Sequence, residues 1–397
     1  MRGHIRKRGK NSWAIVMEIG RDATTGRRRQ QWQTIQGNKK DAEKLLSNML
    51  HSQDKGIFVK PTRTTIGEFL EQWLKDYVKT NTAPRTRERY IQIIRSHLIP
   101  SLGNIPLTQL RPDLIQSYYA SELNNGRLDG KGGLSATTVL HHHRVLSEAL
   151  NHAVKWGLVV RNVAQAVDPP RTTRKEMNTL APEDIPVLFE EAKQVEYSSG
   201  LPYFTMILTA FHTGMRRGEF MGLKWRDIDF NQVTISVSRS LQSTGDDGYI
   251  FREPKTQKAR RLIAMTPTLA VELRKHKNAQ EMQRSVIGSP LTEDDLVFSN
   301  PDGRPINPNT VSPTFTKLAR RVGLKLRLHD LRHSHASLML KAGIHPKIVS
   351  ERLGHATVAL TLDTYSHIMP GLQEAAAKAF DENLPRIASH RSLPQPV

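Results

Sequence analysis

The stretch "YFTMILTAFHTGMRRGEFMGL", residues 203–223, decides how the second half of the chain folds. Its first part is mostly apolar, which predicts a helix buried within a core. Gly214 marks a sharp turn, and apolar residues return after it in a second short helix. Two adjacent arginines, Arg216 and Arg217, stand at this turn.

The sequence around this stretch predicts a mixed α+β domain over residues 179–384. Upstream, "APEDIPVLFEEAKQ" predicts a helix with Pro182 in its first turn and acidic residues that favour the helix dipole. Downstream, "QVTISVSRSL" (232–241) and "RRLIAMTP" (260–267) predict two strands that flank a polar stretch containing "EPKTQKA". The remainder is mainly helical.

Residues 62–167 predict a small helical domain. Four segments carry apolar residues at helical spacing, with charged residues between them. These segments span residues 65–80, 83–103, 111–125 and 135–159. The triplet at 141–143 is three histidines, but three adjacent residues on a helix point in different directions, so we expect no metal site there.

Residues 1–57 are the most basic part of the chain. "SWAIVMEIG" and "RRRQQWQTIQ" predict two strands, and "NKKDAEKLLSNML" predicts a helix capped by Asn38. A small basic sheet backed by one helix suits insertion into a DNA groove, although a solvated cationic tail remains an alternative. The Pro-rich, cationic "VDPPRTTRKEMN" (167–178) predicts an extended linker, and we expect disorder over 385–397.

The composition indicates a protein that binds polyanions. Lys and Arg number 58 against 38 Asp and Glu, a formal charge of +20, and nucleic acid is the commonest polyanionic partner. No apolar run approaches the roughly 20 residues needed to span a bilayer, and we expect no signal peptide. The chain has no cysteine, which excludes disulfides, thiol catalysis and Cys-rich zinc sites. We therefore expect a cytoplasmic, nucleic-acid-binding protein.

Four stretches occur in a fixed order: "TGMRRGE" (213–219), "PKTQKARR" (254–261), "HDLRHSHA" (329–336) and "LGHATVALTLDTY" (353–365). In their order and internal spacing they resemble the tyrosine recombinases, the lambda-type integrases of phages and integrative elements. The resemblance covers the third segment fully. It implies that residues 62–167 form the helical core-DNA-binding domain, and that residues 1–57 form an arm-type DNA-binding module of three strands and a helix.

The resemblance assigns the catalytic positions, which are Arg216, Lys255, His329, Arg332, His355 and the nucleophile Tyr365. Lys258 is a weaker candidate for the lysine, because the family's lysine lies at a hairpin turn. Glu219, three residues after Arg216, is expected to orient that arginine. The resemblance further implies cleavage of one strand through a 3′-phosphotyrosyl link, a homotetramer on double-stranded attachment sites, and an excisionase and a host DNA-bending protein as possible partners.

The chemistry explains these residue types. A phosphodiester repels a nucleophile because its oxygens are negative, and two guanidiniums neutralise that charge with bidentate hydrogen bonds. Their effect is largest in the pentacovalent transition state. His329 precedes Arg332 by three residues, so both face the same way on a helix and the histidine can move a proton. Lys255 can protonate the departing 5′ oxygen, so no metal, nucleotide or other cofactor is required.

Three other interpretations remain at this point. "HDLRH" matches a zinc-peptidase pattern with Asp in place of Glu. "ASLMLKAGIHPKIVSERLGH" (336–355) resembles a helix-turn-helix with Gly343 in its turn, as in a non-enzymatic DNA-binding regulator. A type IB topoisomerase would share the tyrosine chemistry. Each arginine alone is an ordinary surface ion-pair partner, and Tyr365 alone is an ordinary helix-end tyrosine; the ordered set favours catalysis.

Overall fold

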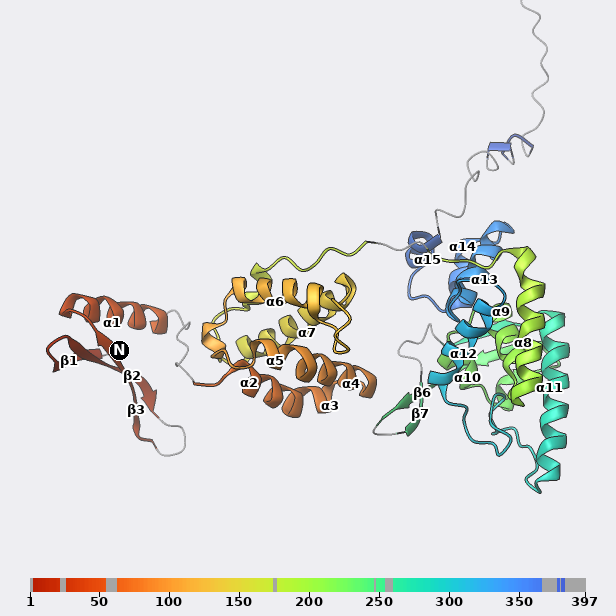
Figure 1. The fold of residues 1–397 in the computed structure, drawn as a ribbon, viewed down its shortest axis with the longest axis horizontal. Coiled ribbons are helices and arrows are strands. Elements are labelled where there is room, and N and C mark those ends of the chain that lie inside the picture. The colour runs from red at the N-terminus through yellow and green to blue at the C-terminus, as the bar shows by residue number, and fades with distance from the viewer. Residues whose placement is uncertain are drawn as a thin grey trace, which may run out of the picture. The chain divides into compact units, whose positions relative to one another are not determined.

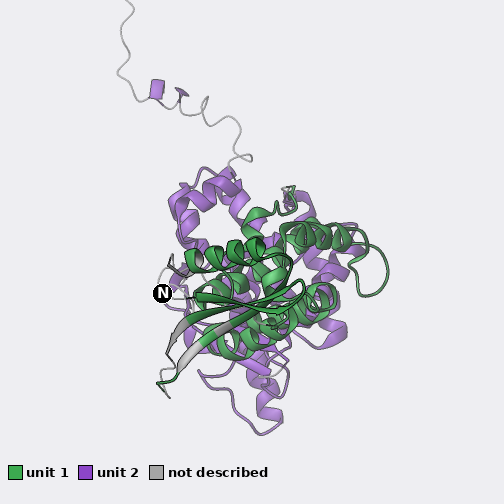
Figure 2. Cartoon of the chain, turned by 90° about the vertical axis from the view of Figure 1, so that its left-hand side faces the viewer, with its two compact units in different colours: residues 1–174 green, residues 175–397 purple. Residues whose placement is uncertain are grey.

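The chain divides into two compact units, Met1–Arg174 and Lys175–Val397 (Figure 2). The computed structural model describes residues 3–21, 26–54, 63–173, 177–245, 248–253, 260–365, 377–378 and 380–382. The described residues are mainly helical with small antiparallel sheets, which confirms the predicted fold class. Every helix among them is too short or too polar to traverse a bilayer.

The first unit begins with a three-stranded antiparallel sheet in the order β1-β2-β3, covered by helix α1 (Figure 1). Its elements are β1 (Gly3–Gly9), β2 (Ser12–Arg21), β3 (Arg28–Gln36) and α1 (Lys39–Asp54). Ile15 and Met17 of β2 are fully buried and pack against Ala42 and Met49 of α1. The sheet and helix thus share one small hydrophobic core.

The cap of α1 and the strand β1 can be compared with the expectations from the sequence. The Asn38 cap is confirmed: Asn38 Oδ1 accepts from the Asp41 amide at 3.0 Å, and Asp41 Oδ2 accepts from the Asn38 amide at 3.1 Å. Strand β1 was not predicted from its residues, because its run of cations hides the period-2 pattern. An edge strand tolerates such cations, and they oppose pairing with other chains.

The four predicted helical segments are present in the rest of the first unit (Figure 1). The two earlier segments each contain a π-helical turn, at Leu74–Val78 and Ile94–Leu98. The α-helices are α2 (Ile66–Trp73), α3 (Lys79–Asn81), α4 (Pro84–Ile93), α5 (Ile99–Leu102), α6 (Pro112–Asn125) and α7 (Ala136–Lys155). Their core is built around the buried Trp73, whose ring stacks on Tyr77 and Tyr90.

Among its described residues, the second unit has eight α-helices, two short 3₁₀ helices (Pro182–Asp184 and Trp225–Asp227) and two small antiparallel sheets (Figure 1). The helices are α8 (Ile185–Ser199), α9 (Tyr203–Thr213), α10 (Arg217–Met221), α11 (Pro267–Val286), α12 (Pro308–Arg321), α13 (Asp330–Lys341), α14 (Pro346–Leu353) and α15 (Val358–Tyr365). The buried helix, sharp turn and second helix predicted for 203–223 correspond to α9, Gly214 and α10.

The strands of the second unit differ from the prediction in one respect. Residues 232–241, expected as one strand, form β5 (Thr234–Val237) and the start of β6 (Ser240–Thr244) in different sheets. The chain changes sheet at Arg239, whose side chain pairs with the buried Asp227. The sheets are β4 (Ile228–Asp229), β5 and β8 (Arg261–Ala264), and the hairpin of β6 and β7 (Gly248–Arg252).

The division into domains at 1–57, 62–167 and 179–384 remains our proposal. Separate hydrophobic clusters support it: one lies within residues 15–49, one within 66–167, and two lie within 180–365. The boundary between the two compact units falls inside the predicted linker at 167–178. The predicted tail at 385–397 lies outside the described residues.

The turn at Gly214, after α9, leaves little room for a side chain. Its φ is +64°, and an added Cβ would stand 2.7 Å from Leu353 Cδ2 and 2.8 Å from His335 Cδ2. We expect Gly214→Ala to lower the free energy of unfolding by roughly 2–4 kcal/mol, from backbone strain and overpacking together. Urea denaturation of both proteins measures this difference.

Gly200 provides the matched control, because its φ is +67° but nothing lies within 4 Å of an added Cβ. Gly200→Ala should therefore cost only the backbone term, roughly 1–2 kcal/mol. Equal losses in the two variants would show that the packing around Gly214 is not restrictive.

Candidate active site

Tyr365 is the last residue of α15 and is almost completely buried. Its ring packs in a small cluster with Ala336 of α13 and Leu353 of α14. Its hydroxyl lies 2.8 Å from Nδ1 of His333. The phenol is therefore held by packing on one side and by a single hydrogen bond to α13 on the other.

Arg332 is a buried cation held by the ends of two helices. Its Nη1 donates to the carbonyl of Gly214 at 2.7 Å, and its Nη2 donates to the carbonyl of Leu353 at 2.8 Å. Gly214 follows α9 and Leu353 ends α14, so both carbonyls lie at the negative end of a helix dipole. Burial and the neighbouring charge of Arg216 lower the pKa of Arg332 to about 9, which leaves it charged at neutral pH.

Arg216 precedes α10, and Glu219 holds it in place. Arg216 Nη1 donates to Glu219 Oε1 at 2.8 Å, and its amide donates to Oε2 at 2.9 Å. Arg261 Nη2 also donates to Glu219 Oε2, at 2.8 Å, while Arg261 Nε donates to the carbonyl of Arg352. Burial acts to raise the pKa of Glu219, but Arg261 and Arg216 outweigh it and hold that pKa below its usual value.

Arg216 also links to the second arginine through the backbone. Its Nη2 lies 3.4 Å from the carbonyl of Gly354, the residue after the Leu353 carbonyl that binds Arg332. The Arg216 side chain remains 43% exposed, whereas Arg332 is buried. The pair therefore presents one accessible and one buried guanidinium at the end of α14.

Three histidines complete the site. His329 and His333 lie at the start of α13, with ring centroids 4.9 Å apart. His355 Nδ1 lies 2.8 Å from the hydroxyl of Thr361 in α15. Desolvation lowers the pKa of all three, with further contributions from neighbouring charges, to about 4 for His333 and His355. All three imidazoles are thus neutral at pH 7, when they can accept or donate a hydrogen bond.

The protonation state of Tyr365 follows from the same environment. Burial raises the pKa of its phenol to about 12, while the charge of Arg332 acts in the opposite direction. The positive surroundings expected from the sequence are present, but they do not produce a phenolate at neutral pH. Since His333 is neutral, its Nδ1 accepts the phenolic proton in a hydrogen bond when Nε2 carries the ring proton.

The structure thus gathers the expected residues from three of the four quoted stretches, 213–219, 329–336 and 353–365. Arg216, Glu219, His329, Arg332, His355 and Tyr365 are linked by the contacts and charges above. Lys255 and Lys258 lie outside the described residues. Sequence reasoning missed His333 and Arg261, although both stand inside the quoted motifs "HDLRHSHA" and "PKTQKARR". Their roles depend on partners 32 and 42 residues away in the chain, which the motifs do not reveal.

The described residues do not support the zinc-peptidase interpretation. The carboxylate of Asp330 is fully buried and accepts from the amide and guanidinium of Arg327. Neither it nor His329 or His333 belongs to a group of three potential metal ligands among the described residues. The helix-turn-helix expected at 336–355 is present as two helices, α13 and α14, joined by a turn at Gly343. These helices carry Arg332 and the Leu353 carbonyl that binds it, so they form part of the candidate active site.

Comparison with known families gives two matches along this chain. A model described as "Phage integrase family" matches residues 178–370, and one described as "Phage integrase, N-terminal SAM-like domain" matches residues 65–123. The first match includes every described residue of the site. The second falls on the helical part of the first unit.

Individual relatives agree with these matches. The chain is 27% identical over 395 residues to a "Tyrosine recombinase XerC-like" protein of Caldanaerobacter subterraneus subsp. tengcongensis, covering 95% of this chain and 97% of the relative. It is 32% identical over 254 residues to the ICEBs1 integrase of Bacillus subtilis, covering 64% of this chain and 67% of that protein.

Solved structures share the fold. The Tn1549 transposon integrase, in complex with a circular intermediate DNA, superposes with a TM-score of 0.64 at 21% identity, covering 80% of this chain and 99% of that one. A lambda integrase tetramer bound to a Holliday junction gives a TM-score of 0.52 at 18% identity, covering 89% and 95%.

The neutral state of His333 predicts how stability depends on pH. An unfolded histidine binds a proton near pH 6.5, whereas folded His333 does so only near about 4. The unfolded chain therefore holds more protons in this window, and the free energy of unfolding falls as the pH decreases through it. His333→Gln should show a smaller fall, measured by urea denaturation at several pH values. The same pH dependence in both proteins would contradict a neutral His333.

Proposed function

The chain belongs to the phage integrase family of tyrosine recombinases, enzymes that cleave and rejoin DNA, and we propose that Tyr365 is its nucleophile. One observation carries this proposal: the buried hydroxyl of Tyr365 is hydrogen-bonded to a neutral imidazole, in the electrostatic field of the buried cation Arg332. A purely structural tyrosine would not need a buried guanidinium nearby whose hydrogen bonds go to backbone carbonyls.

The two arginines form the proposed site for the scissile phosphate. Arg332 uses two of its N–H groups on backbone carbonyls, so its positive charge is not neutralised by a carboxylate in those contacts. Glu219 contacts Arg216 but shares its charge with Arg261. The cluster therefore keeps a net positive charge, which attracts a phosphodiester and stabilises the additional negative charge of the pentacovalent transition state.

The proposed reaction moves one proton to the base and one to the leaving group. The Tyr365 oxygen attacks phosphorus while its proton passes to His333 Nδ1, and the bond from phosphorus to the 5′ oxygen breaks. The product is a 3′-phosphotyrosine and a 5′ hydroxyl. Lys255 is proposed to protonate the departing oxygen; this role rests on its position in "PKTQKARR". His329 and His355 are proposed to hydrogen-bond the phosphate.

The substrate and assembly follow from the family and from the charge of the chain. We propose double-stranded attachment sites of a phage or integrative element as the substrate, bound in the cytoplasm of a bacterial host. The formal charge of +20 supports such binding. A homotetramer on DNA, as in the lambda integrase structure, is the proposed active assembly. An excisionase and a host DNA-bending protein are possible partners in controlling its direction.

The basic sheet at the N-terminus is the proposed module for a second class of DNA site. Trp32 on β3 is 46% exposed, and the guanidinium carbons of Arg6 and Arg8 on β1 lie 5.7 and 5.9 Å from the centre of its ring. This arrangement holds two cations on one exposed surface of the sheet, where phosphates can reach them.

Tyr365→Phe tests the central proposal. Phenylalanine keeps the buried ring but removes the oxygen, so we expect normal folding, near wild-type DNA affinity and no covalent complex. His333→Gln should also fold and should slow formation of the complex by roughly a hundred-fold or more, as expected for a lost general base. A labelled suicide substrate and a denaturing gel measure both effects.

Two results would contradict this assignment. A covalent band from Tyr365→Phe, or a peptide map that places the DNA on another tyrosine, would remove Tyr365 as the nucleophile. A wild-type rate in His333→Gln would leave the nucleophile in place but assign its proton to another acceptor.

The N-terminal module has a separate test. Deletion of residues 1–57 should abolish binding to arm-type sites, because it removes the basic sheet and its helix. It should leave cleavage of a core site intact, because the described catalytic residues all lie beyond residue 215. Footprinting measures the first effect and the suicide substrate measures the second. Unchanged protection of every site would refute the module assignment.

A further inference from the structure

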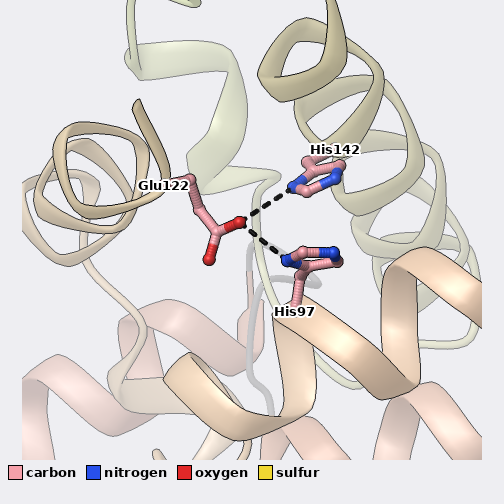
Figure 3. A group of neighbouring side chains, drawn as sticks. All are labelled: His97, Glu122 and His142. Carbon is pink, nitrogen blue, oxygen red and sulfur yellow. Dashed lines mark ion pairs between the residues drawn. The ribbon is translucent and has the colours of Figure 1, made fainter. Parts of the chain in front are cut away.

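A second cluster of ionisable side chains lies in the helical part of the first unit, whereas the residues proposed for catalysis belong to the second unit. It consists of His97, Glu122 and His142, which are 9%, 6% and 1% exposed. The three come from three different segments: the π-helical turn after α4, helix α6 and helix α7 (Figure 3). Such turns are frequent at functional sites.

The geometry of this cluster is close to that of a metal site. Glu122 Oε2 lies between the two rings, 2.8 Å from His97 Nδ1 and 3.8 Å from His142 Nδ1 (Figure 3). The three ligand atoms all lie within 4.8 Å of one another. Around a tetrahedral zinc ion with bonds of about 2.0–2.2 Å, neighbouring ligand atoms stand about 3.3–3.5 Å apart. The distances from Glu122 Oε2 to the two nitrogens, 2.8 and 3.8 Å, lie just below and just above this range. Small movements of the side chains would therefore bring the three atoms to zinc-binding separations.

The electrostatics of the cluster leave the carboxylate incompletely satisfied. Glu122 Oε2 is buried and has no hydrogen bond of acceptable geometry in the described residues, despite its short distance to His97. A buried carboxylate oxygen without a hydrogen bond is costly, and a bound cation would remove that cost.

A route for an ion is present. His97 and His142 both line a pocket of about 350 Å³, together with Arg89, Arg127 and Thr138. With three protein ligands, a fourth coordination position would remain for water or a small anion from this pocket. The Tyr118 hydroxyl now lies 2.8 Å from His142 Nδ1, and an ion on that nitrogen would displace it.

We propose that His97 Nδ1, Glu122 Oε2 and His142 Nδ1 form a zinc-binding site that joins three helical segments of the first unit. Two imidazoles and one carboxylate suit zinc, whereas calcium and magnesium prefer sites made only of oxygen. Because the ligands come from separate segments, the ion would tie them together and stabilise the folded unit by mass action. The proposal does not depend on the assignment of Tyr365.

Zinc binding to the full-length, chelator-treated protein tests the proposal. Isothermal titration with zinc chloride should show a saturable site that Glu122→Gln and His142→Gln weaken at least about 100-fold. His141→Gln is the matched control, since His141 is exposed and adjacent to His142 on α7. It should retain wild-type affinity. Zinc should also raise the melting temperature of the wild type and of His141→Gln, but not that of the two ligand variants.

Tyr118→Phe provides a variant that leaves all three ligands in place. Removing the hydroxyl frees His142 Nδ1, so zinc should bind with equal or higher affinity. This result supports the site even if a ligand variant fails to fold. The proposal is overturned if the wild type shows no saturable zinc binding, if His141→Gln loses as much affinity as His142→Gln, or if Tyr118→Phe abolishes binding. The trio would then be a buried ion pair only.

Discussion

The hydrogen bonds from Arg332 to the carbonyls of Gly214 and Leu353 are the constraint on which the active site depends. They join α13 to the ends of α9 and α14, and so bring together segments more than a hundred residues apart. A buried guanidinium is tolerated here because two helix dipoles face it, although neither carbonyl removes its charge. The fold thus maintains a positive centre in its interior, and the other charged groups are arranged around that centre. Glu219 holds Arg216 beside it, and Arg261 prevents the carboxylate from neutralising the pair.

Burial also controls the protonation state of Tyr365. Desolvation keeps Tyr365 protonated, so a free phenolate is not exposed to solvent in the absence of substrate. Binding a phosphodiester against Arg216 and Arg332 would place the electrophile where the phenol can use its contact with His333. In this arrangement His333 and His355 remain neutral chiefly because burial lowers their pKa, and neighbouring charges, Arg332 among them, act in the same direction. In the proposed mechanism, charge stabilisation and proton transfer therefore belong to different side chains.

Local sequence patterns predicted most of the helices, caps and turns described above. The features that they missed depend on contacts between residues far apart in the chain. The helices of the first unit, the Asn38 cap and the turn at Gly214 follow from spacing and residue type within a few positions. The division of residues 232–241 between two sheets depends on Arg239 pairing with Asp227, which no local pattern encodes. The spacing of the histidines at 141–143 shows only that they point in different directions on a helix. It does not reveal that His142 lies next to His97 and Glu122, which come from helical segments earlier in the chain. The role of Lys255 still rests on its motif alone.

The position of Gly214 has a consequence for how the enzyme tolerates change. The carbonyl that binds Arg332 belongs to a residue whose backbone conformation strongly favours glycine, and the other carbonyl belongs to the end of α14. The two groups that hold Arg332 are therefore main-chain carbonyl oxygens, and their positions depend on where α9 and α14 end. α9 is buried, but the exposed residues of α14, Lys347, Ile348 and Glu351, can be exchanged without moving its terminal oxygen, provided that the helix ends where it now does. The exposed face of α14 can therefore vary while the charge at the centre stays in place.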